Sequence, residues 1–281
     1  MIQAELDWSQ VELIIDSALR EDIGSGDMTT ELLFPGDTKC KAIIIAKEDG
    51  VAAGIPVAER VFRKLDENIL WNQKKREGET LKPGDILAGI EASPRIILTG
   101  ERLALNFLQR LSGIASLTSR FVKAVEGLSV KIVDTRKTAP GLRILDKYGV
   151  SVGGGYNHRF GLHDGILIKD NHIRITGGIT QAVKLIRKRI KAESKIEVET
   201  STLAEVMEAI SAGADVIMLD NMPTEVMRQA VEIINRKALT EASGGINLEN
   251  VRNVAETGVD FVSIGALTHS PRALDIALYM L

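Results

Sequence analysis

"KIEVETSTLAEVMEAISAGADVIMLD", residues 195–220, contains a strand, a helix and a second strand in that order. The runs 195–199 and 215–220 are short and strand-like, and the second is mostly apolar, which is typical of a buried strand. The helical pattern between them, 201–213, begins at a possible N-cap, Ser201, and ends at Gly213. Units of this kind connect parallel strands through right-handed crossovers. The stretch therefore predicts a parallel sheet.

The same alternation of strand and helix patterns continues on both sides of this stretch. Six strand-like runs are expected, at 130–134, 165–170, 195–199, 215–220, 238–243 and 260–265. Helical patterns lie between most of them, so the sheet either closes into an α/β barrel or stays open and doubly wound. No Gly-x-Gly-x-x-Gly motif follows a strand and no Walker loop is present, which disfavours a nucleotide-binding open sheet. Residues 39–99 instead indicate short strands and turns, followed by a long helix near 99–125.

The composition excludes several classes of protein. A net charge of −3 over 281 residues creates no overall field that attracts nucleic acid or anionic lipid. Cys40 is the single cysteine, so no internal disulfide can form, which fits a reducing compartment. No apolar run reaches membrane-spanning length, and the first residues lack a secretory pattern. We therefore expect a cytoplasmic protein, in which any anion binding comes from a local cluster.

Polar residues gather where the predicted strands end. Together with the glycine-containing turns after the last two strands, these positions are, in chain order, Thr135, Arg136, Lys137, Lys169, Glu199, Asp220, Ser243, Gly244, Gly245, Ser263, Ile264, Gly265 and Ala266. The segment 156–172 adds Arg159 and three of the four histidines, His158, His163 and His172. Loops that follow the strands of a parallel barrel form its active face. We expect these groups at one mouth of the sheet.

Each kind of residue suggests a chemical task. Backbone N–H groups in the two glycine turns can approach a phosphate, especially where a helix follows the turn. Glu199 and Asp220 offer hard oxygen atoms, which together with a phosphate-rich substrate suggest Mg²⁺. Arg136, Lys137, Arg159 and Lys169 form a cationic cluster, and arginine suits planar carboxylates. The predicted ligand is a polyanion with phosphate at one end and carboxylates at the other.

Other interpretations of the same residues remain open. Glu199 and Asp220 could pair with Lys137 and Lys169 in a ring that serves only structure. Glycine turns are common in α/β proteins, and the histidine spacing matches no zinc motif. His163 and His172 are expected to support neighbouring residues, and Cys40 is expected to be buried and inert. The coincidence of all these groups at successive strand ends favours the functional interpretation.

Several motifs carry a family resemblance. "DTRKTAPGLR" (134–143), "GGGYNHRFGLHDGILIKDNH" (153–172), "IEVE" (196–199), "IMLDN" (217–221) and "EASGGI" (241–246) resemble quinolinate phosphoribosyltransferase, the carboxylating nicotinate-nucleotide pyrophosphorylase. "EDIGSGD" (21–27) and "ERLALNFLQRLSGIAS" (101–116) are also similar to that family. The likeness covers nearly the whole chain, in order and without a large insertion.

The resemblance implies both a reaction and a fold. Quinolinate and phosphoribosyl pyrophosphate would give nicotinate mononucleotide, pyrophosphate and CO₂, a step of NAD biosynthesis that uses Mg²⁺. An N-terminal α/β sandwich domain, 1–112, would be joined by a C-terminal helix, 270–281. A seven-stranded, incomplete α/β barrel, 113–269, would carry the catalytic groups. The resemblance also implies a homodimer, in which the N-terminal domain of one subunit completes the site of the other; a higher oligomer is left open.

The family's residue roles carry over at matching positions. Arg102 matches the arginine that reaches quinolinate from the partner subunit, while Arg136, His158 and Arg159 match the residues around its carboxylates. Lys137 and Lys169 match the lysines of that pocket, with catalytic roles. Glu199 and Asp220 match catalytic acids near the metal and the ribose. The remaining substrate-binding positions implied are Thr135, Ser243, Gly244, Gly245, Ser263, Ile264, Gly265 and Ala266. His269 lies near the phosphate end without an assigned role.

Three other functions are kept as alternatives. A paralogue associated with molybdenum transport is similar across the same motifs, although "TRKT" before "APGLR" and the presence of Arg102 favour the quinolinate enzyme. Residues 76–92 faintly resemble a biotinyl or lipoyl carrier domain, but no lysine stands at the tip of an obvious hairpin. A barrel without catalytic function is the last alternative.

Overall fold

The computed structural model describes residues 6–36, 38–191 and 193–281, and these residues divide into two compact units. The N-terminal unit contains the described residues up to 119 together with 138–154 and 267–281. The parallel-sheet unit contains residues 120–137 and 155–266. The chain therefore passes between the units more than once, and the expected boundary at residues 112/113 lies inside one helix, Pro94–Ala124.

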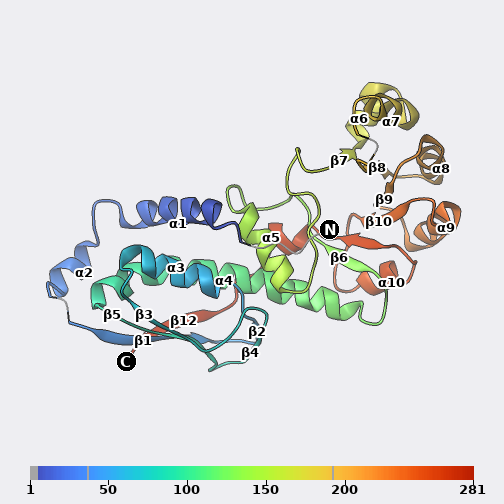
Figure 1. Cartoon of the computed structure of the whole chain (residues 1–281). Coiled ribbons are helices and arrows are strands. Elements are labelled where there is room, and N and C mark those ends of the chain that lie inside the picture. The colour runs from blue at the N-terminus through green and yellow to red at the C-terminus, as the bar shows by residue number, and fades with distance from the viewer. Residues whose placement is uncertain (1–5, 37, 192) are drawn as a thin grey trace. The chain divides into compact units, whose positions relative to one another are not determined.

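The N-terminal unit is built on a four-stranded antiparallel sheet with the order β12-β1-β5-β3. Ala42, Ile44 and Ala46 alternate along β1 and are buried, so this face of the sheet carries the core. Figure 1 shows helices α3 and α4 lying over the sheet. The strands of the unit are β1 (Cys40–Ala46), β2 (Gly50–Val51), β3 (Leu70–Gln73), β4 (Thr80–Leu81), β5 (Ile86–Ala92) and β12 (Ile276–Met280). Its helices are α1 (Trp8–Ile23), α2 (Met28–Leu33), α3 (Ile55–Leu65), α5 (Arg143–Val152), α11 (Ala266–His269, whose first residue belongs to the other unit) and the first part of α4 (Pro94–Ala124).

The predicted C-terminal helix, 270–281, is wrong. Residues Ile276–Met280 form the edge strand β12, which pairs antiparallel with β1 from Ile276↔Ala46 to Met280↔Ala42. Alanine, leucine and methionine favour a helix locally, but pairing satisfies the backbone groups along the open edge of β1, and this tertiary contact overrides local propensity.

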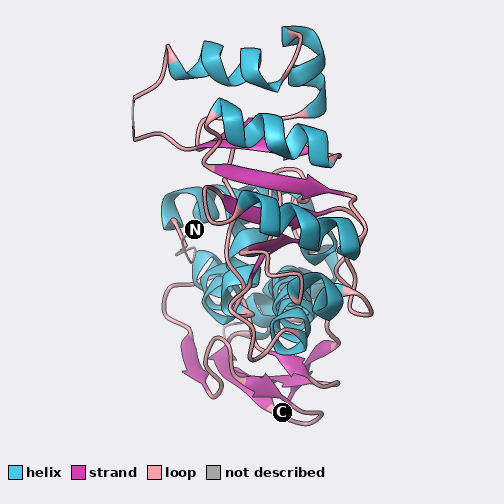
Figure 2. Cartoon of the chain, turned by 90° about the vertical axis from the view of Figure 1, so that its right-hand side faces the viewer, coloured by secondary structure: helices cyan, strands magenta, loops and turns pink. Residues whose placement is uncertain are grey.

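The alternation of strands and helices predicted from the sequence is confirmed in the parallel-sheet unit. Its six strands are β6 (Lys131–Val133), β7 (Ile166–Ile168), β8 (Ile196–Thr200), β9 (Val216–Asp220), β10 (Leu239–Ser243) and β11 (Phe261–Ser263). Their order is β6-β11-β10-β9-β8-β7, and all the pairs are parallel. The helices α6 (Asp170–Thr176), α7 (Ile179–Arg187), α8 (Leu203–Ala212), α9 (Thr224–Ile234) and α10 (Val251–Ala255) lie outside the strands (Figures 1 and 2).

The α/β fold class, with an N-terminal sheet domain followed by a parallel sheet with helices, is confirmed. At the edge of the sheet, an isolated parallel bridge pairs Val133 of β6 with Tyr156, which adds one paired position beside the six strands. Among the described residues no pairing joins Tyr156 to β7, so the sheet stays open on that side. None of the described helices is long and apolar enough to cross a membrane.

Candidate active site

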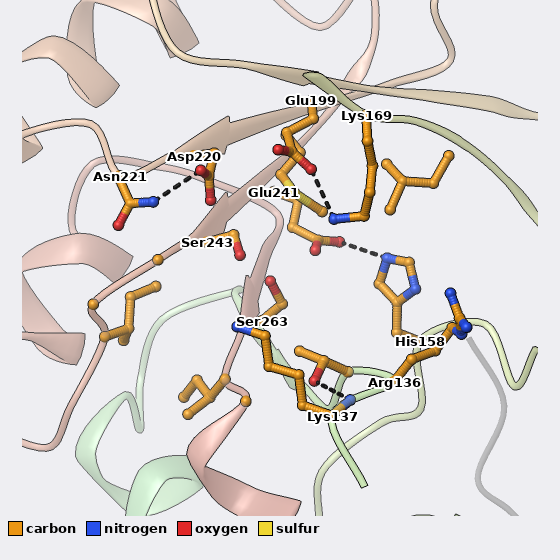
Figure 3. A pocket seen from close by; sticks show the side chains of 18 of the residues that line it. Arg136, Lys137, His158, Lys169, Glu199, Asp220, Asn221, Glu241, Ser243 and Ser263 are labelled. Carbon is orange, nitrogen blue, oxygen red and sulfur yellow. Dashed lines mark hydrogen bonds and ion pairs between the residues drawn. The ribbon is translucent and has the colours of Figure 1, made fainter. Parts of the chain in front are cut away.

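A cavity of about 640 Å³ lies at the carboxyl ends of the parallel strands. Polar and charged residues from successive strand ends and the loops after them form most of its wall. They are Thr135, Arg136, Lys137, His158, Arg159, Lys169, Glu199, Asp220, Asn221, Glu241, Ser243, Gly244, Gly245, Ser263 and Gly265, with Leu167, Met218, Ile246 and Ile264. Figure 3 shows Arg136, His158 and Lys169 on one side and Asp220, Asn221 and Ser243 on the other. We call these sides the cationic end (Arg136, Lys137, His158, Arg159, Lys169) and the glycine end (Asp220, Asn221, Ser243, Gly244, Gly245, Gly265).

Strand alternation explains which side chains face the cavity. Paired residues of neighbouring parallel strands point to the same face of a sheet, and Met218 pairs with both Glu199 and Glu241. Asp220, two residues further along β9, pairs with Ser243. The inward face of the sheet is therefore apolar in part but ends in acids and hydroxyls at the cavity.

A buried carboxylate shapes the cationic end. Asp134 is 0% exposed at the end of β6, and it accepts hydrogen bonds from the His158 backbone N–H (2.9 Å) and the Asn157 amide (2.6 Å). These bonds hold the segment 156–159 beside the loop that carries Arg136 and Lys137. The Thr135 hydroxyl shapes that loop by accepting a hydrogen bond from the Lys137 N–H at 3.0 Å. Short polar side chains thus position the long cationic ones.

Arg159 is fixed within this cluster. One of its guanidinium nitrogens donates to the Gly165 carbonyl at 2.9 Å. Burial lowers the pKa of Arg159 and repulsion from Arg136 lowers it further, while Glu197 acts in the opposite direction. The two guanidinium groups are therefore close enough to repel each other, which favours the binding of a ligand with more than one negative charge.

His158 contacts two acids that come from inside the sheet. Its Nε2 lies 3.1 Å from Glu197 of β8 and 3.5 Å from Glu241 of β10, and its Nδ1 accepts a hydrogen bond from the Arg159 N–H at 2.8 Å. Burial acts to lower the pKa of His158, and the two neighbouring carboxylates act to raise it. A second ring proton would lie on Nδ1, however, where the Arg159 amide hydrogen already points. The geometry therefore favours a ring protonated at Nε2 only. Burial also raises the pKa of Glu197, whereas its hydrogen bond with His158 lowers it.

Lys169 links the cationic end to an acid of the opposite charge. Its Nζ lies 2.9 Å from Glu199, so part of the alternative structural pairing is present (Figure 3). With about half of the Lys169 side chain exposed, this pair contributes little to stability, about 0–1 kcal/mol. Lys169 can therefore leave Glu199 and contact a bound anion at little cost.

The glycine end is built from the backbone. Gly244 and Gly245 have φ of 91° and 63°, values that side-chain-bearing residues rarely adopt. The Asn221 side chain lies directly against Gly244, where an added Cβ would overlap it, and the Asn221 amide also donates to Asp220 at 2.8 Å. Successive N–H groups in such a turn can cradle a phosphate. The expected helix after this turn begins only at Val251, because Asn247 instead accepts hydrogen bonds from the Glu249 and Asn250 N–H groups in a preceding turn.

Two of the acids suit a magnesium ion. Glu199 and Asp220 lie near the carboxyl ends of the adjacent strands β8 and β9, and both line the cavity. Mg²⁺ commonly takes one or two protein carboxylates and completes its shell with water and substrate phosphate, so this pair beside a glycine turn fits the ion. Within the described chain, the group of three side chains with metal-ligand spacing is a different one, His158, Glu197 and Glu241. Nearby guanidinium groups make that position unfavourable for a cation.

Most of the residues singled out in the sequence come together in this cavity. Arg102 and Ala266 are not among its lining residues; Arg102 is exposed on α4, and Ala266 begins α11. His172 accepts the Lys169 N–H at 3.0 Å and so caps α6, which gives it the supporting role expected. His163 and His269 also lie outside the lining.

Sequence reasoning missed Glu197 and Glu241 and gave Asn221 no role beyond its place at a strand end. Glu197 precedes Glu199 by two residues on β8, and Glu241 precedes Ser243 by two on β10, so both glutamates share the inward face of residues that were identified. Period-two alternation was the signal that could have found them. Asn221 has φ of 53°, which the sequence does not reveal.

The fold and cavity define an α/β enzyme whose candidate site lies at the carboxyl end of a parallel sheet, with cationic side chains gathered at one end of it. Family models of quinolinate phosphoribosyl transferase match this chain, the N-terminal domain over residues 27–112 and the C-terminal domain over 114–279. The chain belongs to the quinolinate phosphoribosyl transferase family.

Individual relatives cover nearly the whole chain. The probable carboxylating nicotinate-nucleotide pyrophosphorylase of Bacillus subtilis (strain 168) is 45% identical over 269 residues, covering 96% of this chain and 93% of that protein. The structure of the nicotinate-nucleotide pyrophosphorylase of Ehrlichia chaffeensis superimposes with a TM-score of 0.94 at 43% identity, covering 99% of this chain and 100% of that one. NadC from Streptococcus pyogenes gives a TM-score of 0.94 at 41% identity, covering 98% and 99%.

Proposed function

We propose that this chain transfers a phosphoribosyl group from phosphoribosyl pyrophosphate to quinolinate with loss of CO₂, giving nicotinate mononucleotide and pyrophosphate. The observation that carries this proposal is a single cavity with a cationic end and a glycine end, in a member of this family. A dicarboxylate suits the first end and a sugar phosphate the second.

At the cationic end, Arg136 and Arg159 are proposed to bind the two carboxylates of quinolinate, with Lys137 and Lys169 adding positive charge. Guanidinium groups bind carboxylates through paired hydrogen bonds, and binding a dianion here relieves the repulsion between the arginines. The lysines are also proposed to stabilise charge that develops during the reaction.

At the glycine end, Gly244 and Gly245 are proposed to hold the 5′-phosphate through backbone N–H groups, with Ser243, Ser263 and Gly265 nearby. Glu199 and Asp220 would hold Mg²⁺ and face the ribose. The bound ion would neutralise charge on the departing pyrophosphate.

The proposed reaction needs no covalent intermediate with the protein. The quinolinate nitrogen forms a bond to ribose C1 while the C1–O bond to pyrophosphate breaks and its electron pair leaves with pyrophosphate. The ring nitrogen is then cationic, so the ring accepts the electron pair left when the adjacent carboxylate departs as CO₂. A proton replaces that carboxylate. The chain's main contribution is to hold both substrates close with compensated charge.

The decisive assay measures CO₂ release that depends on both quinolinate and phosphoribosyl pyrophosphate, with Mg²⁺ present. Turnover supports the proposal. A folded, Mg²⁺-supplied protein that releases no CO₂ would contradict it and favour the paralogue associated with molybdenum transport. Intact mass tests the carrier alternative, because an added biotin or lipoate would show modification of the N-terminal unit.

We further propose a homodimer in which Arg102 reaches the partner's cavity. Arg102 is exposed on α4 and is absent from the lining of the cavity described above. Inactive Arg102→Ala subunits mixed with inactive Lys169→Ala subunits should regain activity, because each mixed dimer then holds one intact site. No recovery in confirmed heterodimers would refute this arrangement. A cytoplasmic location stays a prediction from the sequence, which cell fractionation can test.

A further inference from the structure

Two glutamates lie inside the parallel sheet, next to the cationic end. Glu241 is 1% exposed and Glu197 is 9% exposed, and they come from β10 and β8, which flank β9. Both side chains converge on the His158 ring at 3.5 Å and 3.1 Å (Figure 3 draws the Glu241 contact). Burying a carboxylate costs several kcal/mol unless it is paired, so these acids depend on that ring.

The contacts fix the His158 ring at both nitrogens. Nδ1 accepts from the Arg159 N–H, and Nε2 faces the two carboxylates. A ring held in this way cannot rotate without breaking a hydrogen bond on each side. Both ring nitrogens are thus engaged by protein groups, and the ring itself lines the cavity.

The positions of Glu197 and Glu241 are not explained by a contribution to folding stability. The other carboxylate oxygen of each, Oε1 of Glu197 and Oε1 of Glu241, is buried and makes no hydrogen bond within the described part of the chain. Apolar side chains in place of a buried charged group are often neutral or stabilising, and the neighbouring Met218 shows that this face accepts one. Their position against His158 therefore calls for a role at the cavity.

We propose that Glu197 and Glu241 are positioning residues that act through His158. They hold the imidazole as a rigid wall at the cationic end and supply negative charge beneath Arg136 and Arg159. The ring then defines the space for the planar quinolinate ring, while the arginines take its carboxylates. This inference rests on the proposed function, and it assigns His158 a different task from direct carboxylate binding.

The kinetic test replaces each acid by its amide. Glu241→Gln and Glu197→Gln should raise KM for quinolinate about tenfold, which corresponds to about 1.4 kcal/mol. KM for phosphoribosyl pyrophosphate should stay within twofold of wild type. Glu249→Gln, on the exposed surface of the same unit, is the matched control and should change neither KM. Equal rises in both KM values would overturn the proposal.

A double-mutant cycle separates positioning from a general structural role. In a His158→Ala background, Glu241→Gln should raise KM for quinolinate by less than twofold, because the residue through which it acts is gone. Additive effects would overturn the proposal. If His158→Ala does not fold, His158→Asn serves as the background, and Glu197→Gln provides an independent cycle.

The ¹⁵N NMR spectrum of His158 in the ligand-free protein tests the inference without any turnover. The wild-type ring should show one protonated and one unprotonated nitrogen, assigned by comparison with the His158 variant. In Glu241→Gln the two signals should move toward each other as the ring begins to exchange between tautomers. An unchanged spectrum, or two protonated nitrogens in the wild type, would overturn the positioning role. Absence of quinolinate turnover in the wild type would instead count against the proposed function.

Discussion

The cationic end and the glycine end of the cavity hold charge by different means. At the cationic end, long side chains carry full charges, and the buried acids Asp134, Glu197 and Glu241 hold the neighbouring His158 in place. At the glycine end the binding groups are backbone N–H dipoles, positioned by a turn that requires positive φ at Gly244 and Gly245. The first end depends on side-chain chemistry, and the second depends on the absence of side chains.

This difference suggests how one cavity can separate two anions. Fixed guanidinium forks select planar carboxylates, whereas a concave turn of N–H groups selects the rounder phosphate. If each end binds one of the two substrates, a change at one end should alter the kinetics with its own substrate much more than with the other.

The largest effect should come from removing divalent metal. Chelation should lower turnover by about 1000-fold, or about 4 kcal/mol, because the pyrophosphate leaves with its charge uncompensated. Quinolinate binding, measured by equilibrium dialysis, should be unchanged, because Glu199 and Asp220 are proposed to serve the other substrate. Restoration of turnover by added Mg²⁺ is the control. A parallel loss of quinolinate binding would contradict the division between the ends.

Gly244→Ala should have the next largest effect. The left-handed backbone costs an alanine about 1 kcal/mol or more, and the new Cβ would also overlap Asn221. We expect kcat/KM for phosphoribosyl pyrophosphate to fall about 100-fold, or about 2.7 kcal/mol, with KM for quinolinate nearly unchanged.

Gly213→Ala provides the matched control for this change. Gly213 ends α8 with φ of 80°, and a Cβ there would meet open space. It should lower the free energy of unfolding by about 1 kcal/mol while leaving both KM values alone. If Gly213→Ala reduced activity as much as Gly244→Ala, general destabilisation and not the cradle would explain the loss.

Arg136→Ala should mirror the glycine variant at the cationic end. Loss of charged hydrogen bonds costs about 1.5–3 kcal/mol, so KM for quinolinate should rise about 10–100-fold while KM for phosphoribosyl pyrophosphate changes little. Arg136→Lys keeps the positive charge but loses the paired hydrogen bonds of the guanidinium group. Its KM for quinolinate should therefore lie between the values for the wild type and for Arg136→Ala. A lysine variant indistinguishable from wild type would show that charge alone matters at this position.

Much of the glycine end could be predicted from the sequence, because strands 215–220 and 238–243 end in recognisable acids and glycines. Strand alternation is also local, and it could have added Glu197 and Glu241 to the inward face. The cationic end was harder to predict. His158 lies where it does because Asp134, which directly follows β6, accepts its backbone N–H, and its ring meets Glu197 and Glu241 from β8 and β10. Such convergence depends on tertiary contacts, as does the pairing of Ile276–Met280 with β1 that replaced the expected helix.

The smallest effect is expected from Thr135, which tests whether side chains shape the cationic end. Its hydroxyl accepts the Lys137 N–H at 3.0 Å and so shapes the loop that carries Arg136. Thr135→Val removes this acceptor without changing charge, at a cost of about 1 kcal/mol, so KM for quinolinate should rise about fivefold. Thr135→Ser keeps the hydroxyl and should restore the wild-type value. If valine instead raised KM for phosphoribosyl pyrophosphate, the loop after β6 would belong to the glycine end, and the side-chain and backbone modes of binding would not divide the cavity as the geometry suggests.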